Sequence, residues 1–286
     1  MNLLVTKKPL AWIVDSTAYI PKRLQEHPDF FSVPLNIHFG EKQYIDGVDL
    51  TPEQLYEKIK HADEFPKTSQ PSAGEFAERF KVIAENYDEA IAVHVSSKMS
   101  GTLASSTGGA EIAGFPVTFI DSLSLSYGLT GIIERGMEMY ENGATIPEIK
   151  KELEKMPGKC TNFILIGKLD QLYKGGRMSA AQFYLGSLLK VKPIVQISNE
   201  GELKAIEKVR SEKRALQYLI NKISEAHSSG IKKIHLLQGN VPEQAENLKR
   251  MIIEQVPGVE VEIGVISTVL AVHAGEGTFA ILWYEE

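Results

Sequence analysis

The run LAWIVDS at positions 10–16 is apolar almost throughout and ends on an aspartate and a serine. Three similar runs follow it, FFSVPLNIHF (30–39), EAIAVHVSS (89–97) and PVTFIDS (116–122), with helix-like segments between them. Continuous rather than alternating apolar character is typical of strands that are covered on both faces. The alternation of such strands with helices predicts a parallel sheet with helices on both sides, in a domain over residues 1–157.

Helix starts between these strands carry a recognisable signature. A Ser or Thr stands three residues before a Glu or Gln in TPEQ (51–54), SAGE (72–75) and TIPE (145–148). This spacing is the capping box, in which the two side chains satisfy each other's backbone N–H groups. A further helix is expected over 125–140, ending at an Asn-Gly pair.

The pattern changes after MPGK at positions 156–159. Six apolar runs and two helical segments follow, and NEG at 199–201 joins two of the runs with a hairpin signal. We therefore predict an α+β domain over residues 158–286 with a mostly antiparallel sheet. Part of residues 39–70 is a candidate to pack with this second domain.

Composition excludes several classes of function. The 286 residues carry a formal net charge of -6, which disfavours a nucleic-acid partner or an anionic membrane surface. The single cysteine, Cys160, allows no internal disulfide and no multi-cysteine metal site, and it is expected to be a small buried residue. The first residues do not follow a signal-peptide layout, and no apolar run is long enough to span a bilayer. We predict a cytoplasmic monomer without stable membrane insertion and without a bound metal.

Two hydroxyl-rich turns stand out, because the common nucleotide, zinc-protease and hydrolase signatures are missing. KTSQPS (67–72) precedes one helix, and SSKMSGT (96–102) opens another. Free N–H groups and hydroxyls at helix starts suit a carboxylate or a phosphate. Capping alone is the alternative interpretation of each turn.

Three more positions are candidates for polar chemistry. Arg177 follows a Gly-Gly pair and could pair with an anion, or else with an acidic neighbour such as Asp170. His273 stands before AGEG (274–277), where it either donates to a carboxylate or is an ordinary turn histidine. His94, on the third predicted strand, is expected to be structural rather than catalytic.

The motifs taken in order resemble the DegV family of bacterial fatty-acid-binding proteins. The resemblance rests on IVDST, TSQPS, SSKMSGT, IDSLSLSYG, KGGRMS, GSLLKVKPI, KVRSEKRA and HAGEGT, and it extends from about position 10 to position 283. It implies a two-domain α/β protein that holds one long-chain fatty acid, such as palmitate, in an apolar tunnel between its domains. It also implies a carrier in lipid transport and phospholipid metabolism, with no catalytic activity or cofactor of its own, that presents the fatty acid to a separate fatty acid kinase.

The same resemblance assigns roles to individual positions. It implies that Thr68, Ser100 and His273 hold the carboxylate of the fatty acid. Residues expected near this polar end are Arg177, Ser97 and Gly101. Arg210 resembles an arginine used for docking on the kinase, and a solvated surface is the alternative.

Two departures and several alternatives remain open. Met178 stands where isoleucine is more usual, and Glu276 puts an acidic group close to the expected carboxylate site. Residues proposed to line the tunnel are Ile37, Phe39, Phe163, Leu185 and Leu188. A Ser100–His273 acyl- or phosphoryl-transfer enzyme and a phosphate-binding regulator are the competing functions.

Overall fold

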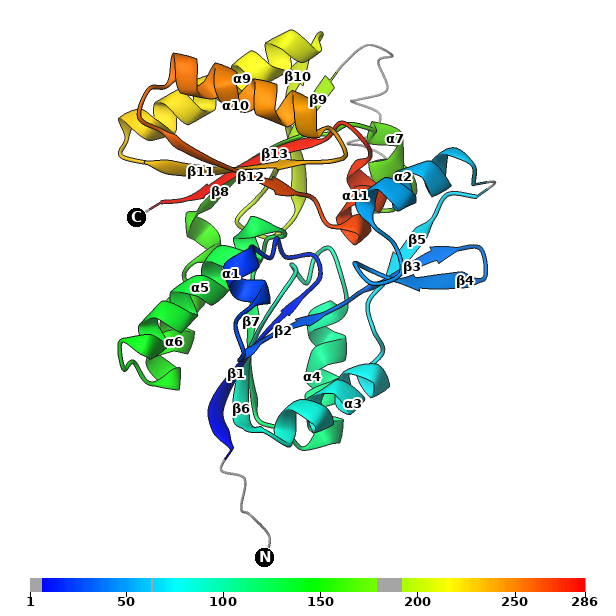
Figure 1. Ribbon diagram of the computed structural model, residues 1–286, viewed down its shortest axis with the longest axis vertical. Coiled ribbons are helices and arrows are strands. Elements are labelled where there is room, and N and C mark those ends of the chain that lie inside the picture. Colours follow the sequence, from blue (N-terminus) through cyan, green and yellow to red (C-terminus); the bar gives the residue numbers. More distant parts are fainter. Residues whose placement is uncertain (1–6, 63, 179–191, 286) are drawn as a thin grey trace, which may run out of the picture. The chain divides into compact units, whose positions relative to one another are not determined.

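The computed structural model describes residues 7–62, 64–178 and 192–285 (Figure 1). The chain forms two compact units. The N-terminal unit runs to Asn36 and resumes over Ser69–Pro157, and the C-terminal unit comprises Ile37–Thr68 and the chain from Gly158 onward. The segment TSQPS therefore begins in one unit and continues in the other.

The N-terminal unit is built on a four-stranded sheet in the order β2-β1-β6-β7. Every neighbouring pair in this sheet is parallel, which confirms the predicted parallel sheet. Its strands are β1 (Lys8–Asp15), β2 (Phe30–Val33), β6 (Tyr87–His94) and β7 (Val117–Asp121). The carboxyl ends of all four strands lie at one edge, where parallel sheets usually bind their ligands.

Helices cover both faces of this sheet, as the continuous apolar strands predict. Ala11 and Ile13 of β1 cluster with Phe76 and Phe80 on one face. Trp12, between them, packs against the other layer, where a Cβ on Gly136 would lie 2.8 Å from its ring. The helices are α1 (Lys22–Gln25), α3 (Ala73–Ala84), α4 (Thr102–Ala113), α5 (Tyr127–Glu141) and α6 (Ile146–Leu153).

The expectation of a single strand over residues 30–39 is wrong. The run splits into β2 and β3 (Asn36–Phe39), which belong to different sheets. Pro34 stands at the break, and its missing N–H cannot donate to a sheet ladder. Strand β3 instead forms a small sheet in the order β4-β3-β5, with β4 (Lys42–Ile45) and β5 (Lys67–Ser69).

The C-terminal unit contains a six-stranded sheet in the order β10-β9-β8-β13-β11-β12. Its neighbours are antiparallel except for the parallel pair β11–β12, which confirms the predicted, mostly antiparallel sheet. Its strands are β8 (Cys160–Leu165), β9 (Lys192–Ile197), β10 (Leu203–Val209), β11 (Lys233–Gln238), β12 (Glu260–Val265) and β13 (Phe279–Tyr284).

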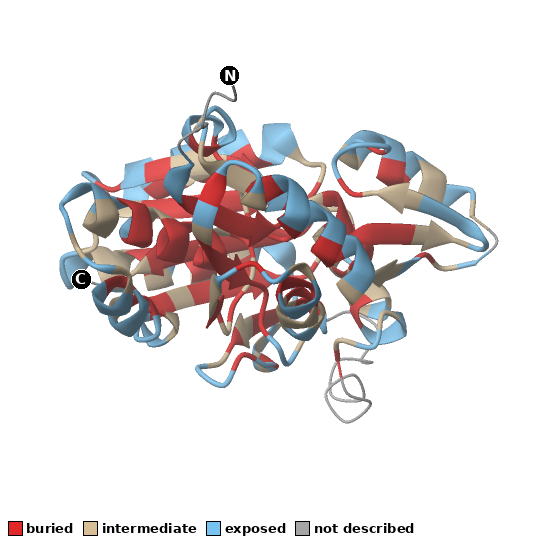
Figure 2. Ribbon diagram, turned by 90° about the horizontal axis from the view of Figure 1, so that it is seen from below, coloured by how far each residue is buried: buried red, intermediate tan, exposed pale blue. Residues whose placement is uncertain are grey.

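The core of this unit lies between its sheet and two long helices. Phe163, Ile281 and Trp283 of the sheet cluster with Leu219 and Leu248 of the helices. Buried residues are concentrated along the strands and the inner helix faces (Figure 2). The helices of the unit are α2 (Pro52–Lys60), α7 (Leu169–Lys174), α9 (Glu212–Ser228), α10 (Pro242–Gln255) and α11 (Thr268–Ala274). None of the described helices of the protein is long and apolar enough to cross a bilayer.

Local signals at helix and strand ends are confirmed. All three predicted capping boxes are present, at the starts of α2, α3 and α6. The NEG turn joins β9 to β10 as an antiparallel pair, and Gly201 adopts a positive φ of 81° there. Cys160 is buried, as expected.

Candidate functional site

A threonine and a histidine that are far apart in sequence meet in the C-terminal unit. Thr68 lies in the short strand β5, and its Oγ1 is 2.8 Å from Nε2 of His273, 205 residues away. His273 does not stand in a loop, as the sequence suggested, but in the last turn of the short helix α11. Small β-branched and aliphatic residues fill that helix and bury one side of it, so the imidazole is held in a fixed place.

The imidazole of His273 packs directly against the backbone of the Gly-Gly turn. A Cβ on Gly175 would overlap Nδ1 of the ring, so only glycine fits at this position. His273 is 9% exposed, and its Nδ1 has no hydrogen-bond partner within the described part of the chain. The histidine is thus satisfied on one side only.

Burial and a neighbouring cation keep this histidine neutral. Desolvation, with a further contribution from the positive charge of Arg177, lowers the pKa of His273 to about 3. Arg177 is itself half-buried, which lowers its pKa, and its Nη1 donates to the carbonyl of Gly175 at 2.6 Å. Asp170, the acidic neighbour considered as a partner for Arg177, lies 3.7 Å from Lys174. The fixed positive charge beside this site therefore belongs to Arg177.

The carboxylate of Glu276 is bonded to Asn240. Its Oε1 accepts a hydrogen bond of 2.6 Å from Nδ2 of Asn240. The acidic group also faces Tyr56, whose buried hydroxyl has a raised pKa because of desolvation and the Glu276 charge. The causes of the lowered pKa of His273 are burial and the positive charge of Arg177.

The second hydroxyl-rich turn lies in the N-terminal unit, between β6 and α4. The Oγ atoms of Ser100 and Thr102 are 2.8 Å apart, and Ser100 also accepts from the N–H of Thr102 at 3.3 Å. Ser97 is exposed, and its N–H donates to the Asp121 carboxylate at 3.2 Å. The N-cap residue of α4 is Gly101, which makes no side-chain cap hydrogen bond, so the hydroxyl bonds are internal to the turn.

The two hydroxyl-rich segments come into contact within the N-terminal unit through Gln70, which the sequence analysis did not single out. A Cβ on Gly101 would lie 2.9 Å from the Gln70 amide nitrogen, so this glutamine of TSQPS covers the turn before α4. The proximity of two separate motifs is a property of the fold. No spacing in the sequence indicates it.

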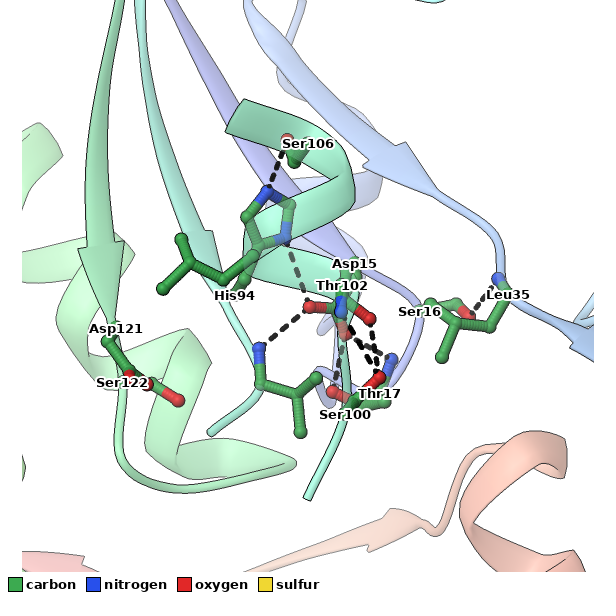
Figure 3. A network of polar contacts seen from close by, with 12 residues as sticks. Asp15, Ser16, Thr17, Leu35, His94, Ser100, Thr102, Ser106, Asp121 and Ser122 are labelled. Atoms are coloured by element: carbon green, nitrogen blue, oxygen red, sulfur yellow. Dashed lines mark hydrogen bonds and ion pairs between the residues drawn. The ribbon is translucent and has the colours of Figure 1, made fainter. Parts of the chain in front are cut away.

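A buried Asp–His–Ser chain ties the same part of the unit together (Figure 3). Nδ1 of His94 lies 3.1 Å from Asp15, and Nε2 of His94 lies 2.8 Å from Oγ of Ser106. Sequence reasoning expected His94 to be structural but did not connect it with the other two residues. A signal was available, because Asp15 and His94 end neighbouring strands of a predicted parallel sheet.

The proposed carboxylate ligands are divided between the two units. Thr68, His273 and Arg177 are brought together in one, whereas Ser100, Ser97 and Gly101 belong to the other. A joint contact of all of them with one carboxylate stays a prediction. Leu185 and Leu188 lie outside the described residues, whereas Phe163 is part of the core between the six-stranded sheet and its helices.

Two further expectations concern the surface and metals. Arg210 is exposed directly after β10, where the sequence placed it, and its docking role stays a prediction. Among the described residues, no group of three His, Cys, Asp or Glu side chains is arranged to hold a metal ion.

Comparison with known proteins identifies the family. The model of the DegV family, described as uncharacterised proteins, matches residues 9–286. A DegV domain-containing protein of Halalkalibacterium halodurans is 35% identical over 281 residues, which are 97% of this chain and 99% of the relative.

Two solved structures share the fold over nearly the whole length. The first, described as a fatty-acid-binding DegV-family protein of Thermus thermophilus, has a TM-score of 0.87 at 28% identity and covers 98% of this chain and 100% of its own. The second, DegV of Bacillus subtilis, is also described as a fatty-acid-binding protein. It has a TM-score of 0.86 at 31% identity and covers 97% of this chain and 99% of its own. The chain therefore belongs to the DegV family.

Proposed function

We propose that this protein binds one long-chain fatty acid and acts as a non-catalytic carrier for it. The observation that carries the proposal is the contact of the part-buried Thr68 with the buried His273, beside the Arg177 guanidinium. A hydroxyl, a neutral imidazole and a nearby fixed cation suit a single carboxylate better than a multiply charged anion. The fatty-acid-binding proteins of Thermus thermophilus and Bacillus subtilis, which share the fold, support this choice of ligand.

The geometry assigns different tasks to the two side chains. A neutral imidazole that donates from Nε2 to Thr68 leaves the threonine hydroxyl hydrogen free to point at a ligand oxygen. His273 then acts on the carboxylate through Thr68, and Arg177 supplies the positive charge that His273 lacks. Ser100 is the proposed contact from the N-terminal unit.

Few polar contacts are needed, because the acyl chain provides most of the binding free energy. Burying hydrocarbon gains about 0.8 kcal/mol per methylene, so ~14 methylenes give on the order of 11 kcal/mol before ordering costs. The apolar tunnel implied by the family resemblance would supply that burial. No cofactor is required for binding of this kind.

Lipid extraction of the purified protein, followed by mass spectrometry, tests the proposal. We expect about one C14–C18 fatty acid per chain, and rebinding of palmitate by the delipidated protein with saturable stoichiometry. A protein that carries no fatty acid and fails to rebind palmitate after delipidation would contradict the proposal.

We further propose that a fatty acid kinase is the partner and that this chain does no chemistry itself. The protein incubated with ATP, Mg²⁺ and palmitate should form no acyl phosphate until the kinase is added. Turnover of ATP by the pure protein would overturn this part.

The competing Ser100–His273 transfer enzyme gains no support from the imidazole. Nε2 of His273 is engaged with Thr68, and Nδ1 lies against Gly175, both within its own unit.

A further inference from the structure

The carboxylate of Asp15 joins the ends of two neighbouring strands in the N-terminal unit. Its Oδ1 accepts from the backbone N–H of Thr17 at 3.0 Å and from the Thr17 hydroxyl at 2.5 Å. Its Oδ2 accepts from the N–H of Val95 at 2.8 Å and lies 3.1 Å from Nδ1 of His94. Asp15 is 0% exposed, so these contacts replace all of its hydration.

These contacts fix the state of the His94 ring. Because the Asp15 carboxylate accepts at this position, Nδ1 of His94 carries the proton and donates it. On a ring with this single proton, Nε2 is the acceptor, and the hydroxyl of Ser106, 2.8 Å away, donates to it. Phe119 stacks on the ring at 6.3 Å and Phe76 meets it edge-on at 5.8 Å, so the imidazole cannot turn.

The far end of this chain of bonds lies on helix α4. Ser106 stands one turn after Thr102, the first residue of the helix, which is bonded to Ser100. A second fixed point is Gly109, where a Cβ would overlap Phe76 of α3. Together the two points set the height and the rotation of α4 on the sheet, and with them the place of the Ser100 hydroxyl.

We propose that His94 is a positioning residue for Ser100, acting through Ser106 and helix α4, with Asp15 selecting the tautomer it needs. Asp15, His94 and Ser106 are each 0% exposed, so none of them touches a ligand and the resemblance to a catalytic triad carries no catalysis. The proposal rests on the proposed function, in which Ser100 contacts the fatty acid carboxylate.

The chain offers a matched pair of variants for the test. Ser106→Ala removes the donor to His94 and favours the helix, because alanine is the best helix former. Thr107→Ala removes a neighbouring hydroxyl that donates only within its own helix, to the carbonyl of Leu103 at 2.9 Å. The first variant removes the hydrogen-bonded link between α4 and His94, whereas the second leaves that link intact.

Palmitate affinity and amide exchange at Thr102 are the two readouts. We expect Ser106→Ala to weaken palmitate binding by about fivefold or more, as loss of one buried hydrogen bond predicts, and to speed exchange of the Thr102 amide. Thr107→Ala should leave both at the parent values. If Ser106→Ala does not fold, Ser106→Cys, a weak donor of similar size, should show the same two changes in milder form.

A nitrogen-15 spectrum of the His94 ring gives an independent arm. The parent protein should show the tautomer proton on Nδ1. A ring protonated at Nε2, or equal effects of Ser106→Ala and Thr107→Ala, would overturn the positioning role. If even the parent binds no palmitate, the proposed function fails, while the ring spectrum and the Thr102 exchange still decide whether the link from Asp15 to α4 exists.

Discussion

His94 and His273, one buried histidine from each unit, are held in opposite ways. His94 in the N-terminal unit uses both ring nitrogens, on Asp15 and on Ser106. His273 in the C-terminal unit uses only Nε2, on Thr68, and its Nδ1 is left without a partner among the described residues. Both nitrogens of the His94 ring are hydrogen-bonded, which we call a closed network, whereas one nitrogen of the His273 ring has no such partner in the part of the chain that the structure describes, which we call an open pair.

The difference separates a scaffold from a binding site. A buried polar atom without a partner costs about 1–3 kcal/mol, so such atoms are few, and they are often found at functional sites. The closed network around His94 can hold an element in place in the absence of ligand. In the open pair around His273, the Thr68 hydroxyl is left to contact a ligand.

The largest effect on palmitate affinity is expected from a substitution that fills the space of the His273 ring. Gly175→Ala would place a methyl group on Nδ1 and force the imidazole away from Thr68. Overpacking and lost hydrogen bonds together predict a loss of palmitate affinity of roughly 100-fold, on the order of 3 kcal/mol. The measurement is palmitate titration of the delipidated variant.

Gly158→Ala is the control for this change, because a Cβ there meets no heavy atom within 4 Å. Parent-like binding by Gly175→Ala would mean that the position of the ring does not matter to the site.

The free energy of unfolding should fall at acid pH because of the same histidine. The pKa of His273 is about 3 in the folded protein, against about 6.5 in an unfolded chain. Between these values the unfolded state takes up a proton that the folded state refuses. The contribution of His273 is therefore complete above pH 6.5, and it is lost at up to about 1.4 kcal/mol per pH unit as the pH falls towards 3.

Urea unfolding at several pH values measures this dependence. His273→Gln cannot be protonated, so its unfolding free energy should fall less steeply than that of the parent between pH 6.5 and 4. Parallel curves for the two proteins would show that His273 is not buried in the neutral form.

Removing the hydroxyl of Thr68 should have a smaller effect on palmitate binding. Thr68→Val keeps the shape of the side chain but leaves Nε2 of His273 and the ligand oxygen without their shared partner. We expect palmitate affinity to fall by about five- to thirtyfold, roughly 1–2 kcal/mol. Thr68→Ser keeps the hydroxyl and should bind nearly as the parent does.

Combination with Ser100→Ala sharpens this result. If both hydroxyls reach one carboxylate, the double variant should bind more weakly than either single variant. A double variant with the affinity of the parent would sink the assignment of both residues.

The sequence predicted the fold better than the site. Continuous apolar runs predict the sheet strands, and capping boxes predict many of the helices, because each signal depends only on residues close together in the sequence. Strands β4 and β5 escaped notice, since three or four mostly polar residues carry no periodicity.

The site was found through motifs rather than through periodicity. Thr68 and His273 are 205 residues apart, and only the family resemblance paired them before the structure did. The cover of Gly101 by Gln70 and the link from His94 to Ser106 depend on how helices settle on the sheet, which no local pattern encodes.

Arg210 belongs to neither histidine region, and its substitution should have the smallest effect on the ligand. It is exposed between β10 and the N-cap Ser211 of α9, next to three other exposed cations, Lys208, Lys213 and Arg214. Rim charges act mainly on the rate of encounter. Arg210→Glu should therefore leave palmitate affinity unchanged but slow kinase-dependent acyl phosphate formation, with a loss that depends on salt concentration.

A charge-matched control separates docking from net charge. Lys151 is exposed on α6 of the other unit, so Lys151→Glu makes the same change in total charge without altering any residue of the cluster at Arg210. If the cluster docks an acidic kinase surface, only Arg210→Glu should slow acyl phosphate formation, and added salt should bring parent and variant rates together because it screens the encounter. If both variants slow acyl phosphate formation equally, the cause is the total charge of the protein rather than docking by the cluster. Loss of palmitate binding in Arg210→Glu would mean that the residue supports the pocket or the fold. If Arg210→Glu forms acyl phosphate at the rate of the parent, the cluster is an ordinary solvated surface.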